Sequence, residues 1–255
     1  MLFEKSQITL KNEHQVEGIR KSGQLLGETL SICRDLVKPG AVPRKIDAEA
    51  RKYIESNGGR PAFLGYQGFP ASICFSLNDA VIHGIPDDTP LVEGDVVSID
   101  CGVELNGYFS DSALTVTAGS VNGEVSTLMR VAEESLELGI GAAVVGNRVK
   151  DISRVIYEHN KKHGYGIVRP YCGHGLGLSL HEDPQIPNYV GRGPNPRLKP
   201  GMVLAIEPMV NLGDDDVEVL DDDWTVVTAD GSVSVHFEHT VVVLPDRVEV
   251  LTLRP

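Results

Sequence analysis

The sequence lacks several features that would assign it to specialised classes of protein. It has only 4 cysteines among 255 residues, and no two of them form a C-x-x-C pair. This scarcity argues against a disulfide framework and indicates reduced, mostly buried thiols of a cytoplasmic protein. No run approaches the roughly 18 apolar residues that cross a bilayer. The N-terminus also lacks a basic segment followed by an apolar one, so we expect neither a membrane span nor a secretory signal.

Positive charge is scarce as well. Lys and Arg number 23 against 36 Asp and Glu, and the net charge of −13 argues against general nucleic-acid binding. Part of the acidic excess lies in one run, D-D-D-V-E-V-L-D-D-D, at residues 214–223. This run is typical of a solvated hairpin or loop. A calcium-binding loop is the alternative, although the run lacks the glycine and the terminal glutamate spacing of an EF-hand.

The rest of the composition is ordinary for a globular chain, with 41% hydrophobic and 23% charged residues and enough length to bury a sizeable core. Apolar residues at spacings of three, four and seven predict an amphipathic helix over 13–37, which Pro39 and Gly40 stop. A hairpin is expected around Asn106 and Gly107. Further helices are expected over 45–57, 123–139 and 147–162.

A short phrase occurs twice in the sequence. Residues 91–100 read L-V-E-G-D-V-V-S-I-D, and residues 198–207 read L-K-P-G-M-V-L-A-I-E. Each copy predicts a glycine turn, a buried strand and then a carboxylate, which is Asp100 in the first copy and Glu207 in the second. An unpaired carboxylate at the end of a buried strand is costly, so the two acids are expected to share a cation.

The duplication extends to the helices. I-D-A-E-A-R-K-Y-I-E-S-N-G at 46–58 resembles D-I-S-R-V-I-Y-E-H-N at 151–160, and no long or flexible linker separates the two parts of the chain. We therefore predict a single domain over 1–255 with two pseudo-symmetric α/β halves, about 13–120 and 121–255. The axis that relates the halves is the expected place for a site, because strands from both halves converge there.

Further metal-binding side chains lie near the repeated strands. Asp111 follows Asp100 across the hairpin, where antiparallel neighbours can place two carboxylates on one face. Carboxylates that close repel unless they are protonated or bridged by metal. Glu238 lies in a strand pattern that could pair back on the strand of Glu207. His174 lies between glycines, which allow close approach of the backbone.

Four carboxylates and one imidazole are too many donors for a single structural zinc, which takes four ligands. The set suits two divalent ions, and Mn, Fe, Co and Zn are all chemically reasonable. Two such ions can hold a hydroxide and clamp a tetrahedral intermediate, so the set predicts a hydrolase. Each acid taken singly is more typical of a solvated or salt-bridged residue, and it is the pairing by repeat that favours a site. His83 and His181 are either core histidines or donors to a developing oxyanion.

Five segments together resemble the type I methionine aminopeptidases, a family with the pita-bread metallopeptidase fold. Their order and spacing are highly specific, and they cover nearly the whole chain. The segments are N-D-A-V-I-H-G-I-P (78–86), S-I-D-C-G-V-E-L-N-G-Y-F-S-D-S-A (98–113), Y-C-G-H-G-L-G-L-S-L-H-E-D-P-Q-I-P (171–187), L-K-P-G-M-V-L-A-I-E-P-M-V (198–210) and F-E-H-T-V-V-V (237–243).

The resemblance implies an α+β pita-bread fold, in which two pseudo-symmetric α/β halves surround a central curved antiparallel sheet with helices on its outer face. It also implies two divalent metal ions, Co, Mn, Fe or Zn. Asp100 would bind one ion, and His174 and Glu207 would bind the other. Asp111 and Glu238 would bridge both.

The implied reaction removes the initiator methionine from nascent polypeptides whose second residue is small. A bridging hydroxide would attack the first peptide carbonyl, with Glu207 as the acid–base group. His83 and His181 would hold substrate and stabilise the intermediate. The resemblance implies a cytoplasmic monomer that acts on nascent N-termini without binding nucleic acid or membrane, and it leaves ribosome association open.

The resemblance further implies an apolar pocket for the methionine side chain. Aromatic rings and soft sulfur suit a flexible thioether, although ordinary core packing uses the same residue types. The implied lining is Phe63, Tyr66, Phe69, Cys74, Leu180, Met209 and Trp224. The sequence departs from the family pattern at Phe63 (more often Cys), Gln67 (His), Phe69 (Tyr), Leu180 (Phe) and Phe109-Ser110 (His-Gly). These departures are expected to affect the catalytic efficiency and the selectivity for the substrate side chain. The five metal ligands match the family pattern.

Other functions of the same fold are the alternatives. Xaa-Pro aminopeptidases and prolidases carry an extra N-terminal domain, whereas this sequence enters the catalytic module after about 15 residues. Type II methionine aminopeptidases carry a helical insertion, for which the segment between Glu207 and Glu238 leaves no room. A metal-free binding module would be expected to have lost ligands, and here all five are present.

Overall fold

The helices of the computed structural model, which describes residues 8–255, begin and end close to where the sequence predicts. Asn12 and Gln15 form a capping box at the start of the first helix, and Asn122 accepts a hydrogen bond from the Val125 amide at the start of the third. Pro43, whose fixed φ suits a first turn, begins the second. The helices are α1 (Glu13–Leu36), α2 (Pro43–Ser56), α3 (Gly123–Ala142) and α4 (Val149–Lys162).

The strands of the first half surround one long hairpin. Asn106 and Gly107 both adopt left-handed backbone conformations, as a type I′ turn requires, so the predicted hairpin is confirmed. β4 of this hairpin pairs antiparallel with β5, β2 and β1. The strands are β1 (Arg60–Pro61), β2 (Cys74–Leu77), β3 (Ala80–Ile82), β4 (Asp95–Leu105) and β5 (Tyr108–Ala118).

The second half contributes two antiparallel sheets, in the orders β15-β14-β9-β7-β8 and β13-β10-β6, and a third sheet in which β11 and β12 join β3. Two extended segments are interrupted, one at Glu207-Pro208 and the other at Phe237-Glu238. The central sheet is therefore divided into shorter ones. The strands are β6 (Gly166–Ile167), β7 (Gly173–Gly175), β8 (Glu182–Ile186), β9 (Val203–Ile206), β10 (Met209–Asn211), β11 (Val217–Val219), β12 (Val226–Thr228), β13 (Ser234–His236), β14 (His239–Val243) and β15 (Val248–Val250).

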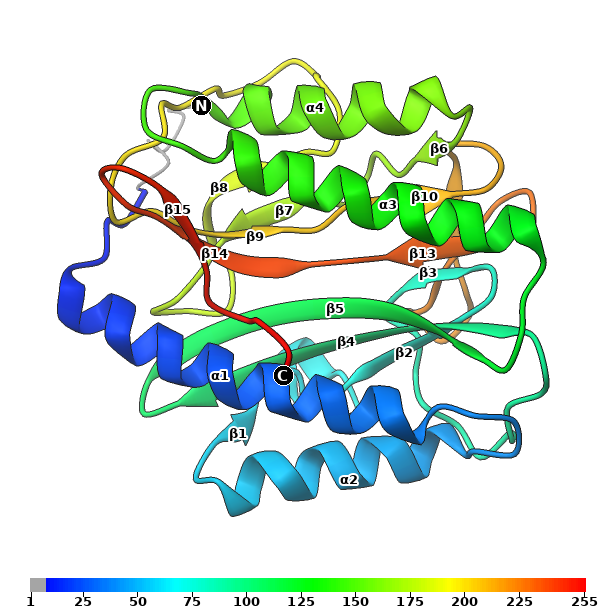
Figure 1. Cartoon of the computed structure of the whole chain (residues 1–255). Helices are drawn as coiled ribbons and strands as arrows, with labels where there is room; N and C mark the ends of the chain where they lie inside the picture. The colour runs from blue at the N-terminus through cyan, green and yellow to red at the C-terminus, as the bar shows by residue number, and fades with distance from the viewer. Residues whose placement is uncertain (1–7) are drawn as a thin grey trace.

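The helices cover the outside of the strands in pairs (Figure 1). α1 and α2 lie against the β4–β5 hairpin, whereas α3 and α4 lie on the opposite side of the molecule over the strands of the second half. Leu26, Ile54 and Ile99 belong to one buried cluster beneath the first pair of helices. Leu128 and Ile206 belong to another beneath the second pair. The layered arrangement leaves the strands of both halves facing each other in the centre.

Hydroxyl side chains join the two halves along β5 and β14. Thr240 Oγ1 accepts a hydrogen bond from the Asp111 amide at 3.0 Å and donates one to the Asp111 carbonyl at 2.7 Å. Ser112 Oγ donates to the Glu238 carbonyl at 2.6 Å, and the Glu238 amide donates to the Ala113 carbonyl at 2.9 Å. These bonds fix Asp111 and Glu238 side by side, although they lie far apart in the sequence.

Three further predictions can be compared with the structure. The acidic run lies on an exposed hairpin, where Glu218 and Val219 of β11 face solvent, so the prediction of a solvated hairpin is confirmed. All four cysteines are free; Cys33, Cys74 and Cys101 are buried and Cys172 is half-buried. Within residues 8–255, none of the helices combines the length and apolar character needed to cross a bilayer.

Candidate metal centre

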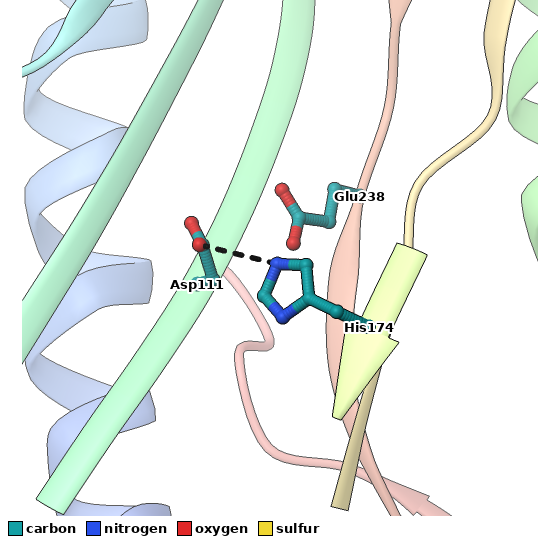
Figure 2. A group of neighbouring side chains, drawn as sticks. All are labelled: Asp111, His174 and Glu238. Carbon is teal, nitrogen blue, oxygen red and sulfur yellow. Dashed lines mark ion pairs between the residues drawn. The ribbon is translucent and has the colours of Figure 1, made fainter. Parts of the chain in front are cut away.

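Three predicted ligands point toward one another from different strands (Figure 2). Asp111 projects from β5, His174 from β7, and Glu238 from the residue before β14. Each offers one ligand atom, and these atoms all lie within 4.8 Å of one another. All three residues are buried. The fold thus brings together donors from both halves at the place where the hydroxyl side chains join them.

The imidazole of His174 is oriented by its own strand. Its Nδ1 lies 2.9 Å from the Gly175 carbonyl, which only an N–H at that position can satisfy. The lone pair of Nε2 then faces the acids, 3.5 Å from Glu207 Oε1 and 4.0 Å from Asp111 Oδ2. Burial, and then the neighbouring His181, lower the pKa of His174 to about 3, so the ring is neutral at physiological pH. A neutral imidazole with its second nitrogen hydrogen-bonded is the usual form of a metal-ligating histidine.

Asp100 and Glu207 complete the acidic group. Glu207 directly follows β9, as the repeated phrase predicts. The same prediction is wrong for Asp100, which lies in the middle of β4 because the strand continues to the hairpin turn after Leu105. Asp100 nevertheless shares a face with Asp111, and the two carboxyl groups are close enough to hydrogen bond.

The acids of this centre are held in an environment that disfavours their charge. Burial raises the pKa of Asp100 to about 7. Burial, and then the Asp100 carboxylate, raise the pKa of Glu207 to about 8. The pKa values of Asp111 and Glu238 rise well above the usual range, first through burial and then through the neighbouring carboxylates. Mutual repulsion in a buried site is relieved by protons or by bound cations.

Unpaired buried oxygens show that cations fit this group. Asp100 Oδ1, Asp111 Oδ1 and Glu238 Oε1 are all buried, and none has a hydrogen-bond partner in the part of the chain that the structure describes. Such atoms are rare in folded proteins because leaving a buried acceptor unsatisfied costs about 1–3 kcal/mol. Oxygens from four carboxylates together with one imidazole nitrogen suit Mn, Fe, Co or Zn. The residues present are therefore compatible with the implied divalent ions.

The two remaining predicted histidines lie at the same cavity. His181 precedes β8, and its Nδ1 lies 2.9 Å from the hydroxyl oxygen of Tyr66. His83 follows β3 with a left-handed φ of 59°, a conformation that is uncommon for a non-glycine residue. Its ring packs edge-on against Tyr171 and Trp224. Burial lowers the pKa of both histidines, to about 4 in the case of His83, so both are neutral donors or acceptors near pH 7.

A cavity of about 610 Å³ lies above the acids and holds most of the predicted pocket residues. All five candidate ligands line it, as do His83 and His181. The pocket residues that line it are Phe63, Tyr66, Phe69, Cys74, Leu180 and Trp224. Met209 does not line it. Its side chain is fully buried in a separate cluster with Val81 and Val226, because β10 turns it away from the cavity.

Sequence reasoning missed several residues near the site. Tyr171, Cys172 and Gln185 also line the cavity, as does Gln67, which was noted only as a departure from the family pattern. His236, at the end of β13, is only 2% exposed and lies 4.0 Å from Glu207, measured from Nε2 to Oε2. Its alternating strand context gives no signal that separates it from a core histidine. Only the fold shows that it faces a candidate ligand.

Comparison with known proteins identifies what this site resembles. The model of metallopeptidase family M24 matches residues 17–245. A methionine aminopeptidase of Clostridium perfringens is 49% identical over 246 residues, which cover 96% of this chain and 99% of that protein. One of Bacillus subtilis is 43% identical over 245 residues, 96% of this chain and 99% of that protein.

Solved structures give the same result. The methionine aminopeptidase of Thermotoga maritima superposes with a TM-score of 0.95 and 38% identity, covering 97% of this chain and 100% of that one. The prolidase of Pyrococcus furiosus superposes with a TM-score of 0.80 and 26% identity, covering 96% of this chain but 66% of that one. The predicted α+β pita-bread fold is confirmed by these likenesses together with the mixed helices and antiparallel sheets.

Proposed function

From the premise that this chain belongs to metallopeptidase family M24, we propose that it removes the N-terminal methionine from polypeptides whose second residue is small. The observation that carries the proposal is the convergence of Asp100, Asp111, His174, Glu207 and Glu238 on the floor of a cavity with apolar walls. The carboxylate oxygens and the imidazole nitrogen provide ligands for metal ions. The apolar walls select the side chain of the first residue of the substrate.

We assign the five donors to two divalent ions. Asp100, Asp111, His174, Glu207 and Glu238 would together hold these ions through four carboxylates and one imidazole. Bound there, such ions supply Lewis acidity, which lowers the pKa of a water nucleophile and polarises the peptide carbonyl. The hydrogen bond from His174 Nδ1 to the Gly175 carbonyl holds the ring so that Nε2 faces Glu207 and Asp111.

The remaining steps belong to side chains of the protein. Glu207 accepts the proton of the attacking water and delivers it to the leaving amide nitrogen, because its Oε1 faces the centre beside His174. His181, held at Nδ1 by the Tyr66 hydroxyl, directs Nε2 at the carbonyl oxygen that gains charge. His83, which lines the same cavity, holds substrate.

The walls of the cavity select methionine. Phe63, Phe69 and Trp224 provide aromatic surface, with the rings of Phe69 and Trp224 packed edge-to-face at 5.1 Å. Cys74 and Leu180 add soft or aliphatic surface at the same cavity. A flexible thioether fits such a wall better than a β-branched or charged side chain does.

The proposed setting is the cytoplasm, where a monomer over 1–255 acts as one catalytic domain on nascent chains at the ribosome. The net charge of −13 argues against general binding to RNA. Sedimentation of the protein with translating ribosomes at physiological salt tests ribosome association separately from activity.

One experiment tests the proposed function. The protein is stripped of metal and assayed on Met-Ala-Ser, Leu-Ala-Ser and Ala-Pro-Ser, with Mn, Fe, Co and Zn added back in turn. We expect release of methionine from Met-Ala-Ser only after metal is restored, with little cleavage of the other two peptides. Equal cleavage of the leucine peptide would refute methionine selectivity. Preferred cleavage of Ala-Pro-Ser would instead place the chain with the prolidase-like members of the fold.

A further inference from the structure

A buried histidine, His236, lies beside the centre. Within residues 8–255, neither of its ring nitrogens has a hydrogen-bond partner, and the side chain is 2% exposed. The backbone around it is fixed, since its amide donates to Thr115 Oγ1 at 2.9 Å and its carbonyl accepts from the same hydroxyl at 2.9 Å. The ring is thus held in place with its polar atoms unused.

An unused buried donor calls for a physical explanation. A neutral imidazole carries one N–H, and leaving a buried donor unpaired costs about 1–3 kcal/mol. Nε2 of His236 points at Glu207 Oε2 across 4.0 Å, whereas Glu207 Oε1 faces His174 Nε2 across 3.5 Å. The Glu207 carboxylate therefore lies between two imidazoles, with one oxygen toward each.

The tautomer follows from this arrangement. When cations neutralise the acidic group, Glu207 is ionised, and a lone pair on His236 Nε2 would then face its negative oxygen, which is repulsive, whereas an N–H there would be attracted. The proton accordingly belongs on Nε2, and Nδ1 is left as an unpaired acceptor. The separation exceeds a direct hydrogen bond, but one bridging water or a side-chain shift of about 1 Å closes it.

We propose that His236 is a positioning residue for Glu207. Its Nε2–H holds Oε2 from behind, so that Oε1 is kept at the metal centre in the orientation that binds the ion and takes up the proton. This inference rests on the proposed function, because Glu207 acts there as both ligand and acid–base group. A polar group that orients a metal ligand in this way typically affects metal affinity or activity by about 10–100-fold.

Two substitutions separate positioning from packing and from direct ligation. His236→Leu removes the donor, and we expect at least a tenfold loss of Mn²⁺ or Co²⁺ affinity and a fall in kcat with little change in KM. His236→Gln places an amide N–H near the position of Nε2 but offers a poor metal ligand. We expect it to keep metal affinity and kcat within about threefold of the wild type.

The measurements are calorimetric titration of the metal-free full-length protein with Mn²⁺ or Co²⁺ and steady-state kinetics on Met-Ala-Ser. His159→Leu is the matched control, since His159 lies on α4 with its Nε2 3.2 Å from Glu134. It should leave both quantities unchanged. If His236→Leu does not fold, His236→Asn, whose amide is too short to reach Oε2, replaces it and should show the same losses.

Two results would overturn the inference. One is wild-type metal affinity and kcat in the Leu or Asn variant, and the other is a loss in His236→Gln as large as in His236→Leu, which would point to direct ligation by the imidazole. If the wild-type protein itself fails to cleave Met-Ala-Ser, the proposed function fails. The metal titrations of the variants would then still decide the role of His236.

Discussion

Asp111 lies directly opposite Gly102 in the β4–β5 ladder, and Asp100 lies one diagonal step away, opposite Ala113. Because Gly102 has no side chain, the ring of Phe63 can approach β4 beside Asp100 and Asp111. A Cβ at this position would lie 2.7 Å from Phe63 Cε1, which is closer than real contacts of this kind. The glycine therefore allows an aromatic wall of the cavity to pack on the face of the hairpin that carries both carboxylates.

Gly102→Ala should displace the Phe63 ring into the cavity. We expect kcat/KM for Met-Ala-Ser to fall about tenfold, mainly through KM, and the free energy of unfolding to fall by about 1–3 kcal/mol, as in other overpacked cores. Adding Phe63→Cys to the glycine variant should restore space and recover part of both quantities. Gly141→Ala is the control, because that helical glycine has open space around it and the change should be neutral or stabilising.

Glu207→Ala should abolish turnover of Met-Ala-Ser, with a loss of about a thousandfold or more, because the variant lacks both a ligand and the acid–base group. Metal affinity should weaken in the same variant, measured by calorimetric titration of the metal-free protein. Glu137→Ala, an exposed residue on α3, is the control and should change neither. Full turnover by Glu207→Ala would remove the basis of the proposed mechanism.

Local patterns were sufficient for the helices and for part of the site. Capping residues and apolar spacing predict helix ends such as that at Asn12, since these signals act over a few residues. The repeated phrase led to Asp100 and Glu207 for the same reason. The strand length around Asp100 was predicted wrongly because the phrase describes only the part before the acid, whereas pairing with β5 extends the strand beyond it.

Contacts between segments far apart in the sequence determine the features of the site that local patterns do not predict. His236 faces Glu207 only because β13 and β10 pair next to the interruption at Pro208. The resemblance places Met209 in the pocket, but Met209 is fully buried in a cluster with Val226 and does not line the cavity. The hydroxyl contacts between β5 and β14 likewise depend on two segments from opposite halves, and no local pattern marks them.

The thiols should differ in reactivity according to burial. Burial raises the pKa of Cys33 to about 12 and of Cys172 to about 11, and it raises the pKa values of Cys74 and Cys101 well above the usual range. Because the thiolate is the reactive form, we expect no reaction of the three buried thiols with Ellman's reagent at pH 8, including Cys74, whose pKa is raised although it lines the cavity. Cys172, which is half-buried, should react slowly, and all four should react in urea. Rapid reaction of more than one thiol in the native protein would contradict this.

His83 should make stability fall as the pH is lowered. Burial, and then the neighbouring His181, lower its folded-state pKa to about 4, whereas the unfolded value is about 6.5. Between these values the unfolded chain binds more protons than the folded one, so the free energy of unfolding decreases from about pH 6.5 to pH 4. The slope contributed by one such group is at most about 1.4 kcal/mol per pH unit.

The contribution of His83 can be isolated by substitution. Other buried histidines, such as His239, titrate in the same direction, so the difference between two pH profiles is the informative quantity. His83→Asn is the matched variant, because asparagine tolerates the left-handed φ of 59° and does not titrate. Urea unfolding of the metal-free protein from pH 4 to pH 8 should give a shallower profile for the variant below pH 6.5 and parallel profiles above it. Parallel profiles throughout would show that His83 is not held neutral by burial.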